Sequence, residues 1–353
     1  MIFRQLFDEA TGTYTYLLAD AASRQGVLVD CVFEHHQRDL ALVRELSLSL
    51  CATLETHVHA DHVTGAWLMR AETGSEIIVS RAGGAQGADR RVGEGDRVQF
   101  GGETLEVRET PGHTDGCLTF VTPDQTLALT GDALLIRGAG RTDFQQGSPA
   151  RLFRSVRDKI LSLPVGCHLY PGHDYRGRKM STVAEERMHN PRLGDHVRRE
   201  DFIGYMNNLG LPHPQRMADA VPANLACGRP ADGQQPTSPS WGPVVRTYAG
   251  VYQVEPEWAH RHLAELQVVD VREDEEVLAS PMGRIVPSVV VPLSGLRGRV
   301  EEVPRGRPVV TVCGSGARSA IAASILEAAG IDEVANLRGG LMRWRALGLP
   351  IET

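Results

Sequence analysis

Residues that commonly bind metal ions follow the apolar runs in the first two thirds of the chain, and this arrangement constrains the fold most strongly. Short runs such as ATLETH, TLEVRETPGH, TLALTGD and HLYPGHD have the apolar and β-branched character of strands, and each ends in Gly, Asp or His. Loops at the ends of neighbouring strands lie close together at the edge of a sheet. We therefore expect a sheet with a cluster of ligand-type residues at one edge.

Seven histidines and aspartates form this predicted cluster. They are His57, His59, Asp61, His62, His113, Asp132 and His173. The first four lie within THVHADHVTG, and the others lie in PGHTDG, TGDALL and PGHD. Apolar residues three and four positions apart in HHQRDLALVRELSL and SPARLFRSVRDKILSLP predict helices between the strands, so we expect sheets covered by helices. The residue types alone allow one metal ion or two.

The chain of 353 residues is long enough for two domains, and its composition changes at Gly228–Pro243. This stretch, GRPADGQQPTSPSWGP, has no apolar period. We expect a linker at 229–249 between domains at 1–228 and 250–353. After the linker, LQVVDVRE, RPVVTVC and DEVANLRGG alternate with a helical pattern that ends at Gly330, which predicts a small parallel sheet.

Charge and composition limit the kinds of partner. The formal net charge is −7, and the sequence contains no dense run of Lys and Arg, which argues against nucleic acid as a partner. No apolar run reaches the length of a membrane span, and the first residues do not resemble a signal peptide. The cysteines lie far apart, as is typical of free thiols in a reducing compartment. We expect a cytoplasmic protein with small-molecule partners; a homodimer is one assembly that the sequence allows.

The pattern HxHxDH, followed at a distance by His, Asp and His, resembles the metallo-β-lactamase superfamily. The resemblance covers about residues 1–230 and implies an αββα sandwich with metal ions at one sheet edge. In hydrolytic members two zinc ions use all seven positions. A dinuclear zinc hydrolase of glutathione thioesters, similar to glyoxalase II, is therefore one function that the resemblance allows.

Further stretches resemble a narrower branch, the persulfide dioxygenases. They include TGDALLIRGAGRTDFQQG, YPGHDYRG, EERMHNPRL and PHPQRMADAVPANLACG. This resemblance implies one Fe(II) per chain, with His57, His113 and Asp132 as its ligands. It also implies oxidation of glutathione persulfide by O₂ and water to glutathione and sulfite. Two imidazoles and one carboxylate leave positions open on iron for substrate and O₂, whereas zinc has no redox chemistry.

The same resemblance implies roles for residues around the metal. The four remaining members of the cluster, His59, Asp61, His62 and His173, would orient the ligands or a water molecule. Arg141 and Tyr175 would line the groove for glutathione. The structural alternative for Arg141 is a salt bridge within its own loop, with Asp143 as partner. Lys179 is a second candidate for contact with an anion.

A second reactive site is predicted in RPVVTVCGSGARSA. Cys313 ends an apolar run, and Gly314 to Ser319 open a helix, so the sulfur would face backbone N–H groups and the positive end of that helix. Such surroundings lower the pKa of a thiol toward neutrality, and the charge of Arg318 adds to the effect. We predict that Cys313 is a nucleophile, and an inert cysteine at a strand end is the structural alternative.

The loop C-x-x-x-x-R-S resembles the active-site loop of rhodaneses, and the resemblance covers about residues 250–353. The related phosphatases have one more residue in this loop, so sulfur transfer is favoured over phosphate hydrolysis. Two departures concern the sulfur donor, because Gly314 stands where many rhodaneses have Arg or Lys, and GRIVPSV replaces their GHIPGA. The resemblance implies transfer of sulfane sulfur between thiosulfate and glutathione through a persulfide on Cys313. A module that only carries sulfur is the non-catalytic alternative.

Overall fold

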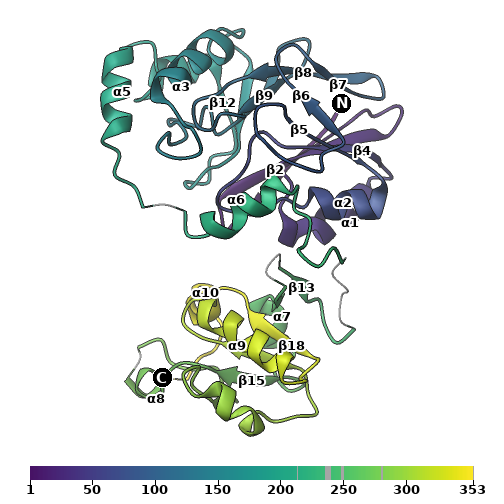
Figure 1. The fold of residues 1–353 in the computed structure, drawn as a ribbon, viewed down its shortest axis with the longest axis vertical. Helices are drawn as coiled ribbons and strands as arrows, with labels where there is room; N and C mark the ends of the chain where they lie inside the picture. Colours follow the sequence, from purple (N-terminus) through teal and green to yellow (C-terminus); the bar gives the residue numbers. More distant parts are fainter. Residues whose placement is uncertain (213, 235–239, 248–249, 280, 353) are drawn as a thin grey trace. The chain divides into compact units, whose positions relative to one another are not determined.

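The computed structural model describes all residues except 213, 235–239, 248–249, 280 and 353. The chain forms two compact units, 1–235 and 236–353 (Figure 1), which divide inside the predicted linker at 229–249. Part of that linker lies outside the described residues. Its later part belongs to the second unit, because Val244 is buried in the core of that unit and β13 (Val245–Arg246) joins its sheet. Among the described residues, no helix has both the length and the apolar character needed to cross a bilayer.

The first unit contains two six-stranded sheets. The first has, in spatial order, β1 (Ile2–Asp8), β2 (Thr13–Ala19), β3 (Gln25–Val29), β4 (Ser49–Leu54), β5 (Glu76–Ser80) and β6 (Arg90–Val92). The second has β12 (Ser181–Thr182), β11 (His168–Pro171), β10 (Leu127–Gly131), β9 (Leu118–Val121), β8 (Glu103–Glu109) and β7 (Arg97–Phe100). Strands β3 to β6 are parallel, as are β10 and β11. The loops that follow β10 and β11 therefore leave the second sheet at the same edge.

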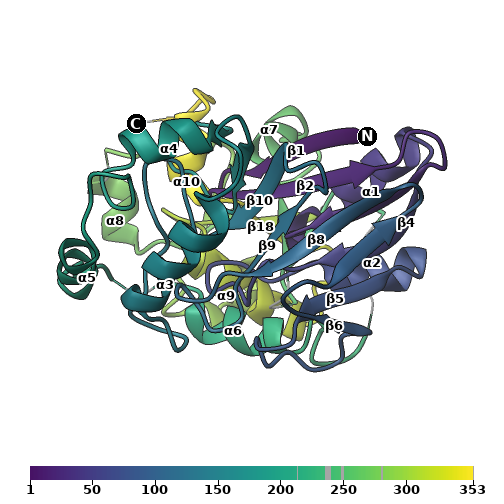
Figure 2. The same ribbon diagram turned by 90° about the horizontal axis from the view of Figure 1, so that it is seen from above.

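The two sheets pack face to face and are covered by helices. Along β2, Tyr14, Tyr16 and Leu18 lie in the core between the sheets, whereas Leu17 faces the core beneath the helices, as expected for alternating strand residues. The helices are α1 (His36–Glu45), α2 (Ala66–Thr73), α3 (Pro149–Ser155), α4 (Val183–His189), α5 (Arg199–Asn207) and α6 (Met217–Leu225). Figures 1 and 2 show α1 and α2 beside β4, with α3 and α5 on the other side of the unit. The predicted αββα sandwich is confirmed.

One predicted helix differs in detail. The apolar pattern at 148–164 predicts a single α-helix, but α3 ends at Ser155 and a π-helical turn follows at Val156–Ile160. Both ends of this wider turn lie in the core beneath the second sheet, together with Leu161. Packing of these side chains therefore decides the geometry of the last turn, and a period read from sequence does not reveal it.

The second unit is built on one sheet. Its order is β13, β14 (Tyr252–Val254), β18 (Val334–Leu337), β17 (Val309–Val312), β15 (Gln267–Asp270) and β16 (Val289–Val290), and every pair except β13–β14 is parallel. Its helices are α7 (Pro256–Arg261), α8 (Asp274–Ala279), α9 (Ala317–Ala328) and α10 (Gly340–Ala346). Ala322 and Leu326 of α9 pack in the core on one face of the sheet, and Leu341 and Trp344 of α10 pack in the core on the other. The predicted small parallel sheet is confirmed.

Candidate metal centre and cysteine cradle

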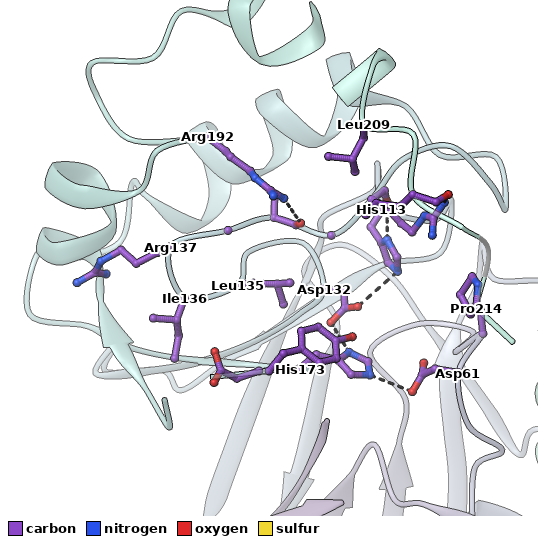
Figure 3. Close-up of a pocket in the computed structure, with 18 of the residues that line it drawn as sticks. Asp61, His113, Asp132, Leu135, Ile136, Arg137, His173, Arg192, Leu209 and Pro214 are labelled. Atoms are coloured by element: carbon purple, nitrogen blue, oxygen red, sulfur yellow. Dashed lines mark hydrogen bonds and ion pairs between the residues drawn. The ribbon is translucent and has the colours of Figure 1, made fainter. Parts of the chain in front are cut away.

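The loops that follow β4, β8, β10 and β11 line a cavity of about 320 Å³ in the first unit (Figure 3). Among its lining residues are His57, His113 and Asp132, whose ligand atoms all lie within 4.8 Å of one another. Figure 3 shows a continuous chain of contacts from His113 through Asp132 and His173 to Asp61. The structure thus brings the three predicted ligands together at one place.

In both His57 and His113 the Nδ1 atom carries the proton and donates it in a hydrogen bond. The Nε2 atom then keeps a free lone pair that can bind a metal ion. His113 Nδ1 lies 2.6 Å from the carbonyl oxygen of Arg141, which can only accept, so Nδ1 carries the proton. The Thr56 hydroxyl donates its proton to Asp30 over 2.8 Å, so the Nδ1 of His57, 3.0 Å away, must donate to that hydroxyl. Burial, followed by the charges of neighbouring imidazoles, lowers the pKa of His57 well below its usual value. Both Nε2 atoms can therefore bind a metal ion.

The carboxylate of Asp132 is ionised and held in place by His173. His173 donates from Nδ1 to Asp132 over 2.8 Å and from Nε2 to Asp61 over 3.0 Å. Burial alone would lower the pKa of His173, but the two carboxylates raise it well above its usual value. Burial alone would raise the pKa of Asp132, but the charge and hydrogen bond of His173 lower it. The second oxygen of Asp132 lies 3.7 Å from His113 Nε2, on the side of the ligand cluster.

Four of the seven predicted residues form a second group whose ligand atoms also lie within 4.8 Å of one another, namely His59, Asp61, His62 and His173. In this group Asp61 Oδ2 accepts from His62 Nδ1 over 2.9 Å as well as from His173. His59 Nε2 lies 3.1 Å from Asp30 Oδ1, and neither residue lines the cavity. Asp61 and His173 line the cavity together with the first group. Among the described residues, His62 Nε2 and both ring nitrogens of His59 have no hydrogen-bond partner.

Two glycines allow the ligand loops to approach closely. A Cβ atom at Gly172 would lie 2.8 Å from Asp132 Oδ1. A Cβ atom at Gly140 would lie 2.2 Å from the backbone oxygen of Asp132 and 2.9 Å from the ring of His113. Any larger residue at either position would displace a predicted ligand.

The cavity is lined by five arginines, namely Arg137, Arg141, Arg176, Arg178 and Arg192. Arg137 and Arg178 are paired with carboxylates, and Arg192 lies over the ring of Tyr205. In the described part of the chain, Arg176 has no acidic partner. The cavity therefore suits an anionic ligand, and Arg176 is a site residue that the sequence reasoning missed, although it lies in the YPGHDYRG stretch.

The guanidinium of Arg141 is bound to other parts of the chain. It donates to both oxygens of Asp143, over 2.7 and 2.6 Å, and to the carbonyl oxygens of Leu211 and Pro212, over 2.9 and 2.6 Å. The salt bridge that was the structural alternative for Arg141 is therefore present. Because Leu211 also lines the cavity, Arg141 shapes one of its walls. Direct contact of Arg141 with glutathione stays a prediction.

Tyr175 lies at the cavity with most of its side chain exposed. Its ring stacks beside that of His173, with centroids 6.0 Å apart and an interplanar angle of 14°. The exposed fraction of 74% leaves the other ring face open for a ligand. Lys179, in contrast, is not among the residues that line the cavity.

In the second unit, Cys313 follows β17 directly and lies in a cradle of hydrogen-bond donors. Its Sγ accepts from the backbone N–H of Gly316 over 3.2 Å and from the hydroxyl of Ser319 over 3.3 Å. Gly316 has a φ of 94°, which favours glycine, and it caps the start of α9. Burial alone would raise the pKa of Cys313, but the hydrogen bonds from Ser319, Gly316 and Ser315 lower it.

The other five cysteines differ from Cys313 in the direction in which their surroundings shift the thiol pKa. All six are free, and burial raises the thiol pKa of Cys31, Cys51, Cys117, Cys167 and Cys227. For Cys117 the pKa is raised to about 12. Cys313 is thus the cysteine of this chain whose surroundings favour the reactive thiolate. Arg318, the other predicted catalytic residue, pairs its guanidinium with Glu276 rather than with the sulfur.

Comparisons with known proteins agree with the two units. The model of the metallo-beta-lactamase superfamily matches residues 9–173, and that of the rhodanese-like domain matches residues 255–347. The curated protein "Persulfide dioxygenase ETHE1, mitochondrial" of Mus musculus is 52% identical over 229 residues, which cover 65% of this chain and 89% of the relative.

Two solved structures are similar to the chain. The crystal structure of ETHE1 from Myxococcus xanthus has 48% sequence identity and a TM-score of 0.63, and the match covers 65% of this chain and 100% of that one. A metallo-beta-lactamase from Staphylococcus aureus matches 96% of this chain and 98% of its own with a TM-score of 0.65. Its identity of 19% shows similarity of fold alone.

Proposed function

Since the chain belongs to the persulfide dioxygenase family of the metallo-beta-lactamase superfamily and carries a rhodanese-like domain, we propose that it is a bifunctional enzyme of sulfur metabolism. One site oxidises glutathione persulfide with O₂ and water to glutathione and sulfite. The other transfers sulfane sulfur between thiosulfate and glutathione. The observation that supports the first activity is the convergence of two imidazole Nε2 atoms and one ionised carboxylate on an arginine-lined cavity.

A single Fe(II) fits the donor set of His57, His113 and Asp132. Two neutral imidazoles and one carboxylate are typical of non-haem Fe(II) oxygenases. When bound, the ion would supply electrons for O₂ chemistry and open positions for the persulfide sulfur and O₂. Both ring nitrogens of His59 and the Nε2 of His62 have no hydrogen-bond partner among the described residues and could serve a second ion. The similarity to a persulfide dioxygenase is what favours a single ion. The dinuclear zinc hydrolase is therefore the less favoured function.

The surrounding residues would hold the ligands and the substrate. The Arg141 carbonyl fixes the ring of His113, and His173 fixes Asp132. Glutathione persulfide carries carboxylates, and Arg176 offers them an unpaired guanidinium at the cavity. The open face of Tyr175 would pack on the tripeptide. These contacts would bring the terminal sulfur of the substrate to the ligand cluster and keep bulk water out.

Metal content and O₂ consumption test this proposal directly. We expect purified protein to contain about one iron and less than about 0.1 zinc per chain, because the first group supplies one set of ligands. Glutathione persulfide should then drive O₂ uptake in an oxygen electrode, and S-lactoylglutathione should not be cleaved under anaerobic conditions. Two zinc ions per chain, together with thioester cleavage that needs no O₂, would establish the hydrolase instead.

Arg141→Gln is expected to raise the KM for glutathione persulfide about tenfold, because the carbonyl of Leu211 in the cavity wall, the carbonyl of Pro212 and the carboxylate of Asp143 lose a charged donor. Iron content should stay unchanged, because the main-chain carbonyl of Arg141 rather than its side chain contacts His113. Steady-state O₂ uptake measures the effect. Asp143→Asn separates the two roles of Arg141: a raised KM supports the wall-shaping role, whereas a lowered KM means that a released Arg141 binds the substrate directly.

The proposed transfer through Cys313 needs no oxidant or reductant. The thiolate attacks the sulfane sulfur of thiosulfate, the S–S bond breaks, and sulfite leaves with the electron pair. A glutathione thiolate then attacks the outer sulfur of the cysteine persulfide, and the Cys313 thiolate leaves. Donors from Gly316 and Ser319 stabilise this thiolate before and after the transfer. The reverse sequence is chemically equivalent.

Shared metabolites connect the reactions of the two fused domains. Glutathione persulfide is the product of one site and the substrate of the other, and sulfite is a product of both. We propose the cytoplasm as the compartment, because all six cysteines are free thiols, which a reducing environment preserves. The mouse relative is named as mitochondrial.

A further inference from the structure

The guanidinium of Arg318, beside the cysteine cradle, is bound by an acidic residue from another helix. Its Nη1 and Nη2 donate to the two oxygens of Glu276 over 2.5 and 2.9 Å. Glu276 lies on α8, and its Oε2 also accepts from the backbone N–H of Glu273 over 3.1 Å, at the start of that helix. The carboxylate is therefore anchored at its own helix and ties α8 to the first turn of α9.

Two described positions close to the cysteine supply no free cation. Gly314, directly after the nucleophile, has no side chain, and a Cβ atom there would lie 3.3 Å from the terminal methyl group of Met282. Arg272 is fully buried and paired with both oxygens of Asp270. Arg318 is therefore the cation that the cysteine loop itself supplies, in the first turn of α9.

The ion pair between Arg318 and Glu276 is charged at physiological pH, but it is weak enough for a ligand to displace it. The bond to Arg318 lowers the pKa of Glu276 to about 2, so the carboxylate is ionised at any physiological pH. The side chains of Arg318 and Glu276 are 39% and 43% exposed, and ion pairs this exposed are weak because water screens them. A dianion such as thiosulfate or sulfite can displace the carboxylate, but only in competition with it.

We propose that Glu276 is a specificity-determining residue of the sulfur-transfer site, which weakens the binding of inorganic oxyanions by occupying Arg318. The inference rests on the proposed sulfurtransferase function. Thiosulfate and sulfite bring up to two negative charges next to the reacting sulfur, whereas an organic persulfide or thiolate brings at most one, so the inorganic dianions lose more from this competition. Glu276 thereby shifts the site from thiosulfate and sulfite toward organic persulfides.

Kinetics of the full-length chain with thiosulfate as donor and 2-mercaptoethanol as an uncharged acceptor test the inference. Glu276→Gln is expected to lower the KM for thiosulfate about two- to fivefold, with kcat changing less than KM and the KM for 2-mercaptoethanol unaltered. Glu275→Gln is the matched control, because it removes the same charge from the same helix without contacting Arg318. An unchanged or raised KM in Glu276→Gln, or an equal decrease in Glu275→Gln, would overturn the inference.

Alkylation of Cys313 gives a second readout that needs no turnover. The rates for anionic iodoacetate and neutral iodoacetamide are measured at Cys313 by peptide mass spectrometry, and their ratio reports anion access. Glu276→Gln should raise this ratio about two- to fivefold, and the rise should vanish when Arg318→Met is added. If wild-type protein shows no transfer from thiosulfate, the proposed function fails, while the alkylation ratio still decides the role of Glu276. An alkylation ratio that is the same in wild type and Glu276→Gln contradicts the proposed role of Glu276.

Discussion

Replacing Asp132 with asparagine is expected to remove iron from the protein and to lower O₂ consumption with glutathione persulfide by more than about 100-fold. Asparagine keeps the shape of the side chain and can still accept from His173, but its amide has no negative charge to bind Fe(II). Elemental analysis and an oxygen electrode measure the two effects. Transfer through Cys313, assayed in the same preparation, should persist and show that the chain is folded.

Asp61→Asn is the matched control for this variant. Asp61 also accepts from His173 and also lines the cavity, but it belongs to the second group of candidate ligands. If one metal ion is held by the first group, Asp61→Asn keeps about one iron per chain and loses activity by at most about 10- to 100-fold, through poorer orientation of His173. If both variants lower the metal content from about two ions, the centre is dinuclear and the proposed mononuclear site is wrong.

The place of the candidate metal-binding cluster could be predicted because its residues share a local signal. His57, Asp132 and His173 each follow an apolar strand, and the parallel pairing of β10 with β11 puts two of the loops at one edge. The helix-covered sandwich follows from the same alternation of strands and helical patterns. Strand ends are local in sequence, so a single chain reveals them.

The hydrogen-bond partners of the ligands could not be predicted, because they depend on tertiary contacts. Asp30 reaches Thr56, and through it His57, from a loop that carries no motif. Arg141 finds its carbonyl partners in Leu211 and Pro212, about 70 residues later. Residue type suggests that an arginine will bind an anion, but only the fold decides which one.

The composition of the predicted linker does not reveal which of its side chains are buried. The stretch at 229–249 is rich in Gly, Pro and Ser, yet it contains Trp241 and Val244, which pack against the core of the second unit. Trp241 lies beside Trp258, with ring centroids 6.1 Å apart. Two apolar side chains among many polar ones leave no period to detect, although their burial is enough to anchor the segment.

Around Cys313, too, contacts between residues close in the sequence could be predicted, whereas a contact between distant residues could not. The printed donors to the Cys313 sulfur, Gly316 and Ser319, lie in the loop after Cys313 and the first turn of α9, so local sequence was sufficient to predict the cradle. The partner of Arg318 is Glu276, 42 residues earlier in the chain, and the sequence offers no reason to connect the two. Because Glu276 binds the guanidinium, the lowering of the Cys313 pKa by Arg318 stays a prediction.

Cys313→Ser is expected to lower thiosulfate:glutathione sulfur transfer by more than about 1000-fold, because a serine hydroxyl cannot form the persulfide intermediate. O₂ consumption with glutathione persulfide should stay within about twofold of the wild-type rate, because the two sites lie in separate compact units. Release of sulfite measures transfer, and an oxygen electrode measures oxidation. With wild-type protein, transfer of many equivalents of sulfur per chain would exclude a module that only stores one.

Ser319→Ala tests whether the cradle acts on the thiolate itself. Loss of the Ser319 hydroxyl removes one of the hydrogen bonds that lower the pKa of Cys313, so less thiolate is present at neutral pH. Transfer should therefore slow at neutral pH and recover as the pH rises above the raised pKa of the thiol. The single hydroxyl proton of Ser319 can go either to the sulfur or to Asn336 Oδ1, which lies 2.6 Å away. A rate that falls equally at every pH would mean that the proton goes to Asn336 rather than to the sulfur. Loss of O₂ consumption in Cys313→Ser would contradict independent sites, because the substitution changes one side chain of the second compact unit, whereas the candidate metal ligands belong to the first.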